Sequence, residues 1–240
     1  MTTFVLAHGA SHGAWCWERV IDRLESAGHR AVAVEFPGRG ASSDRVATTT
    51  LNDWVATLSS VIDLAPLPPV LVAHSAAGIS ASQTAEYRGA DIARLVFVAA
   101  IVPKDGQTGM ETMLGAGPDC ALAANGAMVV THDGLVVSIP PEHAIKTLYN
   151  TTEPGTAHAA IARMCPEALL PMLTPLSLSD SFASVPKAYI GTTDDRVIPV
   201  AYGRQLAANC GADFTAIAGD HSPFYSAVDE LVEQLLNHAA

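Results

Sequence analysis

The sequence predicts an α/β fold built on a mostly parallel, doubly wound sheet with helices on both faces. Six short apolar runs are nearly continuous in Val, Leu, Ile, Phe and Ala, as strands covered on both faces require. Segments with helical spacing separate these runs, and such alternation implies parallel neighbours. At 240 residues, 49% of them apolar, the chain suits one large domain. The expected strands are 3–7, 31–36, 70–74, 94–100, 187–191 and 213–218.

Two segments carry the clearest helical pattern. Apolar residues recur at i, i+3 and i+4 spacing over 15–28 and over 228–236. Gly28 is well placed to end the first helix. Asp229 and Glu230 stand near the start of the second helix, where the helix dipole favours acidic side chains.

The alternation breaks between about Pro103 and Pro186. This stretch is rich in proline and contains an expected hairpin over 128–139 that turns at Asp133 and Gly134. Short helical pieces are expected at 141–149, 156–164 and 166–173. We interpret 103–186 as an inserted, mainly helical cap on a core formed by 1–102 and 187–240. The methionines of this segment are core packing or candidates to line a substrate pocket, and they are Met110, Met113, Met128, Met164 and Met172.

Charge and composition exclude several classes of function. A net charge of −11 argues against nucleic acid and against an anionic membrane surface as partners. No apolar stretch reaches the ~20 residues that span a bilayer, and no basic region precedes the first apolar run, so we expect a cytoplasmic protein. A homodimer is left open. The four scattered cysteines show no Cys-x-x-Cys pair, which indicates reduced thiols, and they are Cys16, Cys120, Cys165 and Cys210. The histidines lack metal-ligand spacing and no phosphate-binding glycine loop is present, so neither metal nor cofactor is expected.

Ser75 is the candidate nucleophile. It follows the apolar strand 70–74 and precedes small residues that open a helix, which is the arrangement of a nucleophile elbow. The usual motif G-x-S-x-G has glycine on both sides, whereas Ala73 and Ala77 stand here and glycine is delayed to Gly78. An ordinary helix N-cap serine is the alternative reading.

Two further side chains complete the chemistry that a serine nucleophile needs. His221 lies in a loop between the last strand and the last helix, at the edge of the sheet where such folds keep their sites. Asp194 and Asp195 follow the strand 187–191 in the same sense, and one of them can orient the imidazole. The chain order Ser, Asp, His is that of α/β-hydrolases.

The loop 8–15, HGASHGAW, follows the first strand directly. Acyl transfer requires backbone N–H donors aimed at the developing oxyanion, and this fold takes them from an early loop and from the residue after the nucleophile. The amides of Ala10 and Ala76 are therefore the expected oxyanion hole. His74, beside the nucleophile, is interpreted as packing or as part of the pocket lining.

Together, the segment 8–17 (HGASHGAWCW), the segment 24–29 (LESAGH) and the Ser, Asp and His elements resemble the α/β-hydrolase group of plant methylesterases and hydroxynitrile lyases. Related bacterial esterases, among them pyrethroid hydrolases, are similar around 221–226 (HSPFYS). The resemblance implies Ser75 as nucleophile, His221 as base, and the amides of Ala10 and Ala76 as oxyanion donors. Its Asp-x-x-Ile-Pro pattern matches 195–199 and so favours Asp195 over Asp194.

The resemblance implies an esterase for small to medium hydrophobic carboxylic esters, working through an acyl-enzyme. A hydroxynitrile lyase is the first alternative. That branch typically carries threonine after the first histidine and lysine after the last, where this chain has Gly9 and Ser222. A hydrolase-like binding protein or biosynthetic enzyme is the second alternative, and the alanines of the elbow keep it open.

Overall fold

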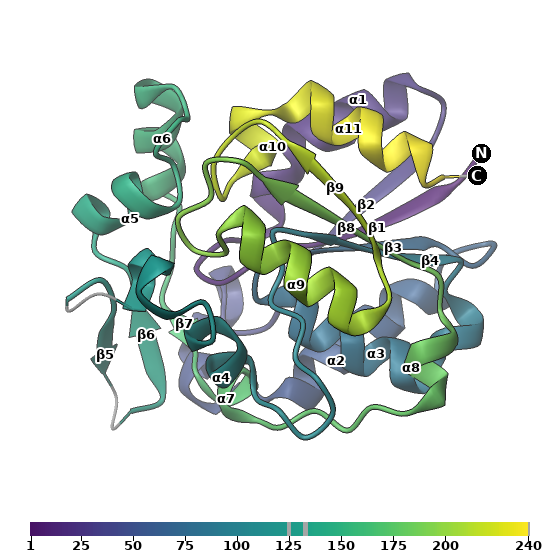
Figure 1. Cartoon of the computed structure of the whole chain (residues 1–240), viewed down its shortest axis with the longest axis horizontal. Coiled ribbons are helices and arrows are strands. Elements are labelled where there is room, and N and C mark those ends of the chain that lie inside the picture. The colour runs from purple at the N-terminus through teal and green to yellow at the C-terminus, as the bar shows by residue number, and fades with distance from the viewer. Residues whose placement is uncertain (124–125, 132–133, 240) are drawn as a thin grey trace.

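Six parallel strands form the central sheet, and each coincides with one of the apolar runs that predicted it (Figure 1). The computed structural model describes residues 1–123, 126–131 and 134–239. The strand order is β2-β1-β3-β4-β8-β9, and every neighbouring pair is parallel. The predicted doubly wound sheet is confirmed. Its strands are β1 (Thr3–Ala7), β2 (Arg30–Val34), β3 (Val70–His74), β4 (Arg94–Val98), β8 (Lys187–Thr192) and β9 (Asp213–Ile217).

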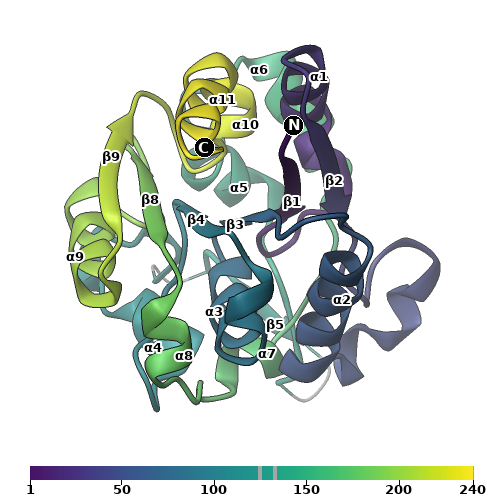
Figure 2. The same cartoon turned by 90° about the vertical axis from the view of Figure 1, so that its right-hand side faces the viewer.

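Helices cover both faces of the sheet (Figure 2). Successive side chains of a strand point to opposite faces, so β1 sends Phe4 and Leu6 to one apolar cluster and Val5 and Ala7 to the other. This two-sided burial explains why the strands read as continuous apolar runs. One layer contains α1 (Glu18–Ser26), α10 (Pro223–Ser226) and α11 (Val228–Asn237), and the other contains α2 (Leu51–Asp63), α3 (Ala77–Arg88), α8 (Asp180–Ser184) and α9 (Val200–Cys210).

The two helices predicted most clearly are present. The first begins as the 3-10 helix η1 (Ala14–Trp17) and continues as α1, and Gly28, at φ +84°, follows its end. Asp229 and Glu230 lie in the first turn of α11. Within the described residues, no helix combines the length and the apolar character needed to cross a bilayer. The remaining 3-10 helices are η2 (Gly40–Thr48), η3 (Gly89–Asp91), η4 (Gly117–Asp119) and η5 (Ala121–Ala123).

The 109–173 part of the segment between β4 and β8 gathers at the end of the sheet where the strands terminate (Figure 1). It contains helices and a three-stranded antiparallel sheet in the order β5-β6-β7. Two strands match the expected hairpin, whose turn residue Asp133 lies outside the described residues. The elements are α4 (Gly109–Leu114), β5 (Val129–Thr131), β6 (Val136–Ser138), α5 (Pro141–Thr147), α6 (Pro154–Ile161), β7 (Glu167–Ala168) and α7 (Leu170–Leu173).

One local prediction in this segment is wrong. A helix was expected from residue 166, but Glu167 and Ala168 form β7, and only Leu170–Leu173 is helical. The reason is tertiary, because Ala168 pairs with Val136 and Glu167 pairs with Val137 of β6. The spacing of apolar residues within 166–173 carries no information on a strand partner about thirty residues earlier in the chain.

Candidate active site

Ser75 lies in the sharp bend between β3 and α3. Its φ of +51° is in the left-handed region, which a residue other than glycine occupies only when its surroundings hold it there. The amide of Ser75 donates to the carbonyl of Val98 at 3.1 Å, and its own carbonyl accepts from the amide of Ile101 at 2.9 Å. The flanking Ala73 and Ala77 are fully buried. The bend therefore accommodates alanine where the usual motif has glycine.

Two glycines are required by close approach around this bend. A Cβ on Gly78 would lie 2.4 Å from the carbonyl oxygen of Ile101. A Cβ on Gly9 would lie 2.7 Å from the Cβ of Ser75 and 2.8 Å from Nδ1 of His74. The loop after β1 thus runs directly against the serine, which places its backbone at the edge of the reacting position.

The side chains of Ser75, His221 and Asp195 meet in one chain of hydrogen bonds. The Ser75 hydroxyl lies 2.8 Å from Nε2 of His221, and Nδ1 of His221 lies 2.9 and 3.0 Å from the two carboxylate oxygens of Asp195. All three residues are buried. In this arrangement Nδ1–H donates to the carboxylate, which leaves Nε2 free to accept the serine proton.

Of the two candidate carboxylates, Asp195 is the one that reaches the imidazole. Its Oδ1 also accepts from the amides of Val197 and Ile198, at 2.7 and 2.9 Å, so the carboxylate is held in place. Asp194 is exposed, and its carboxylate accepts from the hydroxyl of Thr193 at 2.8 Å.

His74 has a contact that its place in the sequence did not reveal. Its ring is fully buried, and Nε2 lies 2.8 Å from the backbone carbonyl of His221. Burial, and then the neighbouring His221, lower the pKa of His74 well below its ordinary value, so the ring is neutral and Nε2–H donates. His74 thereby fixes the backbone of His221 without placing a positive charge beside it.

Ala10 and Ala76 line the same cavity as Ser75. In the described part of the chain, neither backbone amide has a hydrogen-bond partner within the protein. The carbonyl of Ala10 is held by His12, whose Nδ1–H donates to its oxygen at 2.8 Å. Nε2 of the same ring accepts from the hydroxyl of Tyr149 at 2.7 Å. Burial lowers the pKa of His12 to about 4, which keeps this ring neutral.

Sequence reasoning missed a buried ion pair that contacts the loop 8–15. The guanidinium of Arg39 contacts the carboxylate of Glu167, and both side chains are almost completely buried. Glu167 also accepts from the amide of Ser11 at 2.8 Å, and Nε of Arg39 donates to the carbonyl of His12 at 2.7 Å. The partners are 128 residues apart, and neither stands in a pattern that would have indicated the other.

A second missed residue is Asp220, which is fully buried beside His221. One carboxylate oxygen accepts from the amides of Thr151 and Thr152 at 2.9 and 2.8 Å, and the other accepts from the amide of Ser222 at 3.0 Å. These bonds tie the connection between α5 and α6 to the loop of His221. The position of the histidine therefore depends on the segment inserted between β4 and β8.

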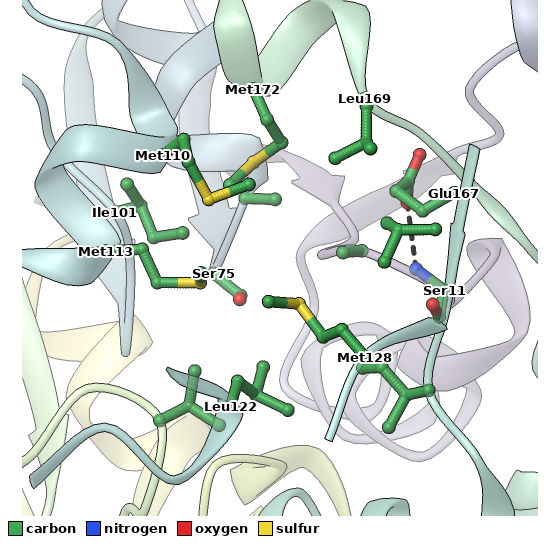
Figure 3. A pocket seen from close by; sticks show the side chains of 15 residues that line it. Ser11, Ser75, Ile101, Met110, Met113, Leu122, Met128, Glu167, Leu169 and Met172 are labelled. Carbon is green, nitrogen blue, oxygen red and sulfur yellow. Dashed lines mark hydrogen bonds between the residues drawn. The ribbon is translucent and has the colours of Figure 1, made fainter. Parts of the chain in front are cut away.

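A cavity of about 40 Å³ opens at Ser75 (Figure 3). Four of the five methionines considered in the sequence line it, namely Met110, Met113, Met128 and Met172. Met164 instead packs, partly buried, against the core. The lining is apolar apart from Ser75, Ser11 and Glu167 in the described part of the chain.

Comparison with known proteins identifies the family. The model of the alpha/beta hydrolase family matches residues 4–234. The chain belongs to the alpha/beta hydrolase family. Methylesterase 7 of Arabidopsis thaliana is 31% identical over 98% of this chain and 95% of its own length. Putative methylesterase 11, chloroplastic, of the same plant is 28% identical over 98% of this chain, which spans 63% of that protein.

The fold agrees with solved alpha/beta hydrolases. The crystal structure of polyneuridine aldehyde esterase superposes with a TM-score of 0.88 at 24% identity, over 100% of both chains. The expected family and fold class are therefore confirmed. The prediction of an esterase of this superfamily agrees with the names of the curated relatives.

Proposed function

We propose that this protein is a serine esterase that cleaves small, largely apolar carboxylic esters through an acyl-enzyme intermediate. The observation that carries the proposal is the imidazole of His221, in hydrogen-bond contact with the Ser75 hydroxyl on one side and the Asp195 carboxylate on the other. A serine hydroxyl becomes a competent nucleophile only when such a base takes its proton.

In the first half-reaction, Nε2 of His221 removes the Ser75 proton as Oγ attacks the ester carbonyl carbon. The tetrahedral oxyanion is held by the amides of Ala10 and Ala76, and the Asp195 carboxylate stabilises the imidazolium. His221 then protonates the departing alcohol, which leaves the acyl group on Ser75. In the second half-reaction water attacks the acyl carbon, His221 takes its proton, and Ser75 leaves with that proton as the acid departs.

We further propose that 103–186 acts as a cap over the core formed by 1–102 and 187–240. Met110, Met113, Met128 and Met172 of this segment line the cavity beside the nucleophile, and apolar side chains there exclude water and accept an apolar substrate.

The proposal is tested with p-nitrophenyl acetate and a fluorophosphonate probe. Wild type is expected to turn over the ester and to be labelled, whereas Ser75→Ala loses both. Ser80→Ala is the matched control, because Ser80 is a buried serine one turn into α3 whose hydroxyl donates to the Ala77 carbonyl and which does not line the cavity. Retained turnover in Ser75→Ala would refute the mechanism. Absent labelling of the wild type would favour a binding protein, and cyanide released from a cyanohydrin would favour the lyase.

A further inference from the structure

The hydroxyl of Ser11 is buried without a partner. Ser11 is 1% exposed and lines the cavity that holds Ser75, and its Oγ has no hydrogen-bond partner in the described part of the chain. Buried hydroxyls are normally paired, so an unpaired one at a cavity wall indicates a position for a ligand group.

The backbone amide and carbonyl of Ser11, in contrast, both form hydrogen bonds. Its amide donates to Glu167 at 2.8 Å, and its carbonyl accepts from the amide of Cys165 at 3.1 Å. These bonds hold Ser11 at a φ of +61°, in the left-handed region. The side chain is therefore presented from a fixed backbone.

Glu167 adds a hydrogen-bond acceptor at the same end of the cavity. One of its oxygens accepts from Ser11 and contacts Arg39, and the other accepts from the amide of Ala168 at 2.9 Å. A carboxylate offers about four acceptor positions, so one remains for a further donor. Because Arg39 offsets the negative charge, this end suits a neutral group that both donates and accepts, such as a hydroxyl.

The two ends of the cavity differ in chemistry (Figure 3). Met110, Met113 and Ile101 lie to one side of Ser75, and Ser11 and Glu167 lie to the other, beside Met128 and Leu169. An apolar group alone would satisfy the first end but would leave the Ser11 hydroxyl unpaired at the second.

We propose that Ser11 and Glu167 form a polar subsite for a neutral hydroxyl on the substrate. The proposal rests on the esterase function above and specifies its substrate class as short esters that bear a hydroxyl group. A Cβ on Gly9 would lie 2.7 Å from the Cβ of Ser75, and Ser11 follows Gly9 by two residues, so the Cα atoms of Gly9 and Ser11 are at most roughly 7 Å apart.

Two pairs of matched esters test the subsite, each exchanging a hydroxyl for a methyl group of similar size. The first pair is methyl 3-hydroxybutanoate and methyl 3-methylbutanoate, which probes the acyl side. The second pair is 2-hydroxyethyl acetate and propyl acetate, which probes the alcohol side. Hydrolysis is followed by titration of the released acid. In wild type we expect kcat/KM to favour the hydroxylated ester by about tenfold in at least one pair, the effect of one neutral hydrogen bond.

Ser11→Ala is expected to reduce that ratio to about one, and Glu167→Gln to reduce it as well. The matched control is Thr84→Val, because Thr84 carries another buried hydroxyl without a partner but does not line the cavity. Its ratio should equal that of wild type. Since the Ser11 hydroxyl has no partner among the described residues, Ser11→Ala should unfold at the wild-type temperature or above, which establishes that it folds.

The outcomes separate the two proposals. If wild type hydrolyses none of the four esters, and does not turn over p-nitrophenyl acetate, the esterase function fails. If wild type hydrolyses both members of each pair equally, or if Ser11→Ala keeps the wild-type ratio, the subsite alone is refuted.

Discussion

Replacing Gly9 with alanine tests the close approach of the β1 loop to the nucleophile. The added Cβ would lie 2.7 Å from the Cβ of Ser75, whereas ordinary contact begins at 3.4 Å, so the gap must open by about 0.7 Å. The loop that moves carries Ala10, whose amide is the proposed oxyanion donor. A misplacement near 1 Å in an active site costs about 10²-fold in rate, so kcat should fall by roughly that factor.

The assay is kcat on p-nitrophenyl acetate, with near-ultraviolet and far-ultraviolet circular dichroism and thermal unfolding to monitor the fold. Overpacking of this size should lower the free energy of unfolding by ~1–3 kcal/mol. Gly155→Ala is the matched control, because a Cβ there would meet only the Glu153 carboxylate, at 3.2 Å, on an exposed flexible side chain. A folded Gly9→Ala protein whose kcat stays within about threefold of wild type would refute the reasoning.

Three further perturbations test the site. Asp195→Asn should lower kcat by about 10⁴, because the amide no longer selects the His221 tautomer with Nδ1–H. The kcat of Asp194→Asn should stay within about threefold of wild type. Equal losses in the two variants would contradict the assignment of Asp195 as the partner of His221. Burial lowers the pKa of His12 from 6.5 to about 4, so the unfolded chain binds more protons at this residue across that range. His12 alone should lower the free energy of unfolding by ~1.4 kcal/mol per unit as pH drops from about 6.5 to 4, and His8 and His74, whose pKa values burial also lowers, add to that slope. Chemical denaturation at several pH values measures this slope, and a flat profile would argue against a buried neutral ring. Asp220→Asn turns one acceptor into a donor facing backbone amides, and should cost about 2 kcal/mol, or about 4–8 °C in Tm by calorimetry; an unchanged Tm would show that the carboxylate does not clamp the loop.

Several features of the fold could be predicted because they depend on local pattern. Strands covered on both faces need apolar residues at every position, so all six runs of the large sheet were visible in the chain. The bend at Ser75 was visible too, because small residues after a buried strand are what a sharp turn into a helix requires. The start of β7 was missed because its structure comes from pairing with β6.

The roles of individual side chains divide in the same way. Ser75 and His221 follow strands whose carboxyl ends share one edge of the sheet, so their convergence could be expected from topology. The choice of Asp195 over Asp194 rested on a resemblance until the structure showed which carboxylate points inward. Neither the anchoring of His221 by His74 nor the bonds of Asp220 had any signal in the chain.

The sequence by itself determined the class of fold, the nucleophile candidate and the order of its partners, because periodicity, small residues at a turn and position after a strand are local properties. Only the tertiary structure decided what surrounds that serine. The Arg39–Glu167 pair joins residues 128 apart in the chain, the amide of Ser11 bonds to Glu167 across 156 residues, and the methionine-lined cavity draws on residues from Ala10 to Val197. Burial and pairing of a side chain depend on what packs against it, and that is a property of the folded chain.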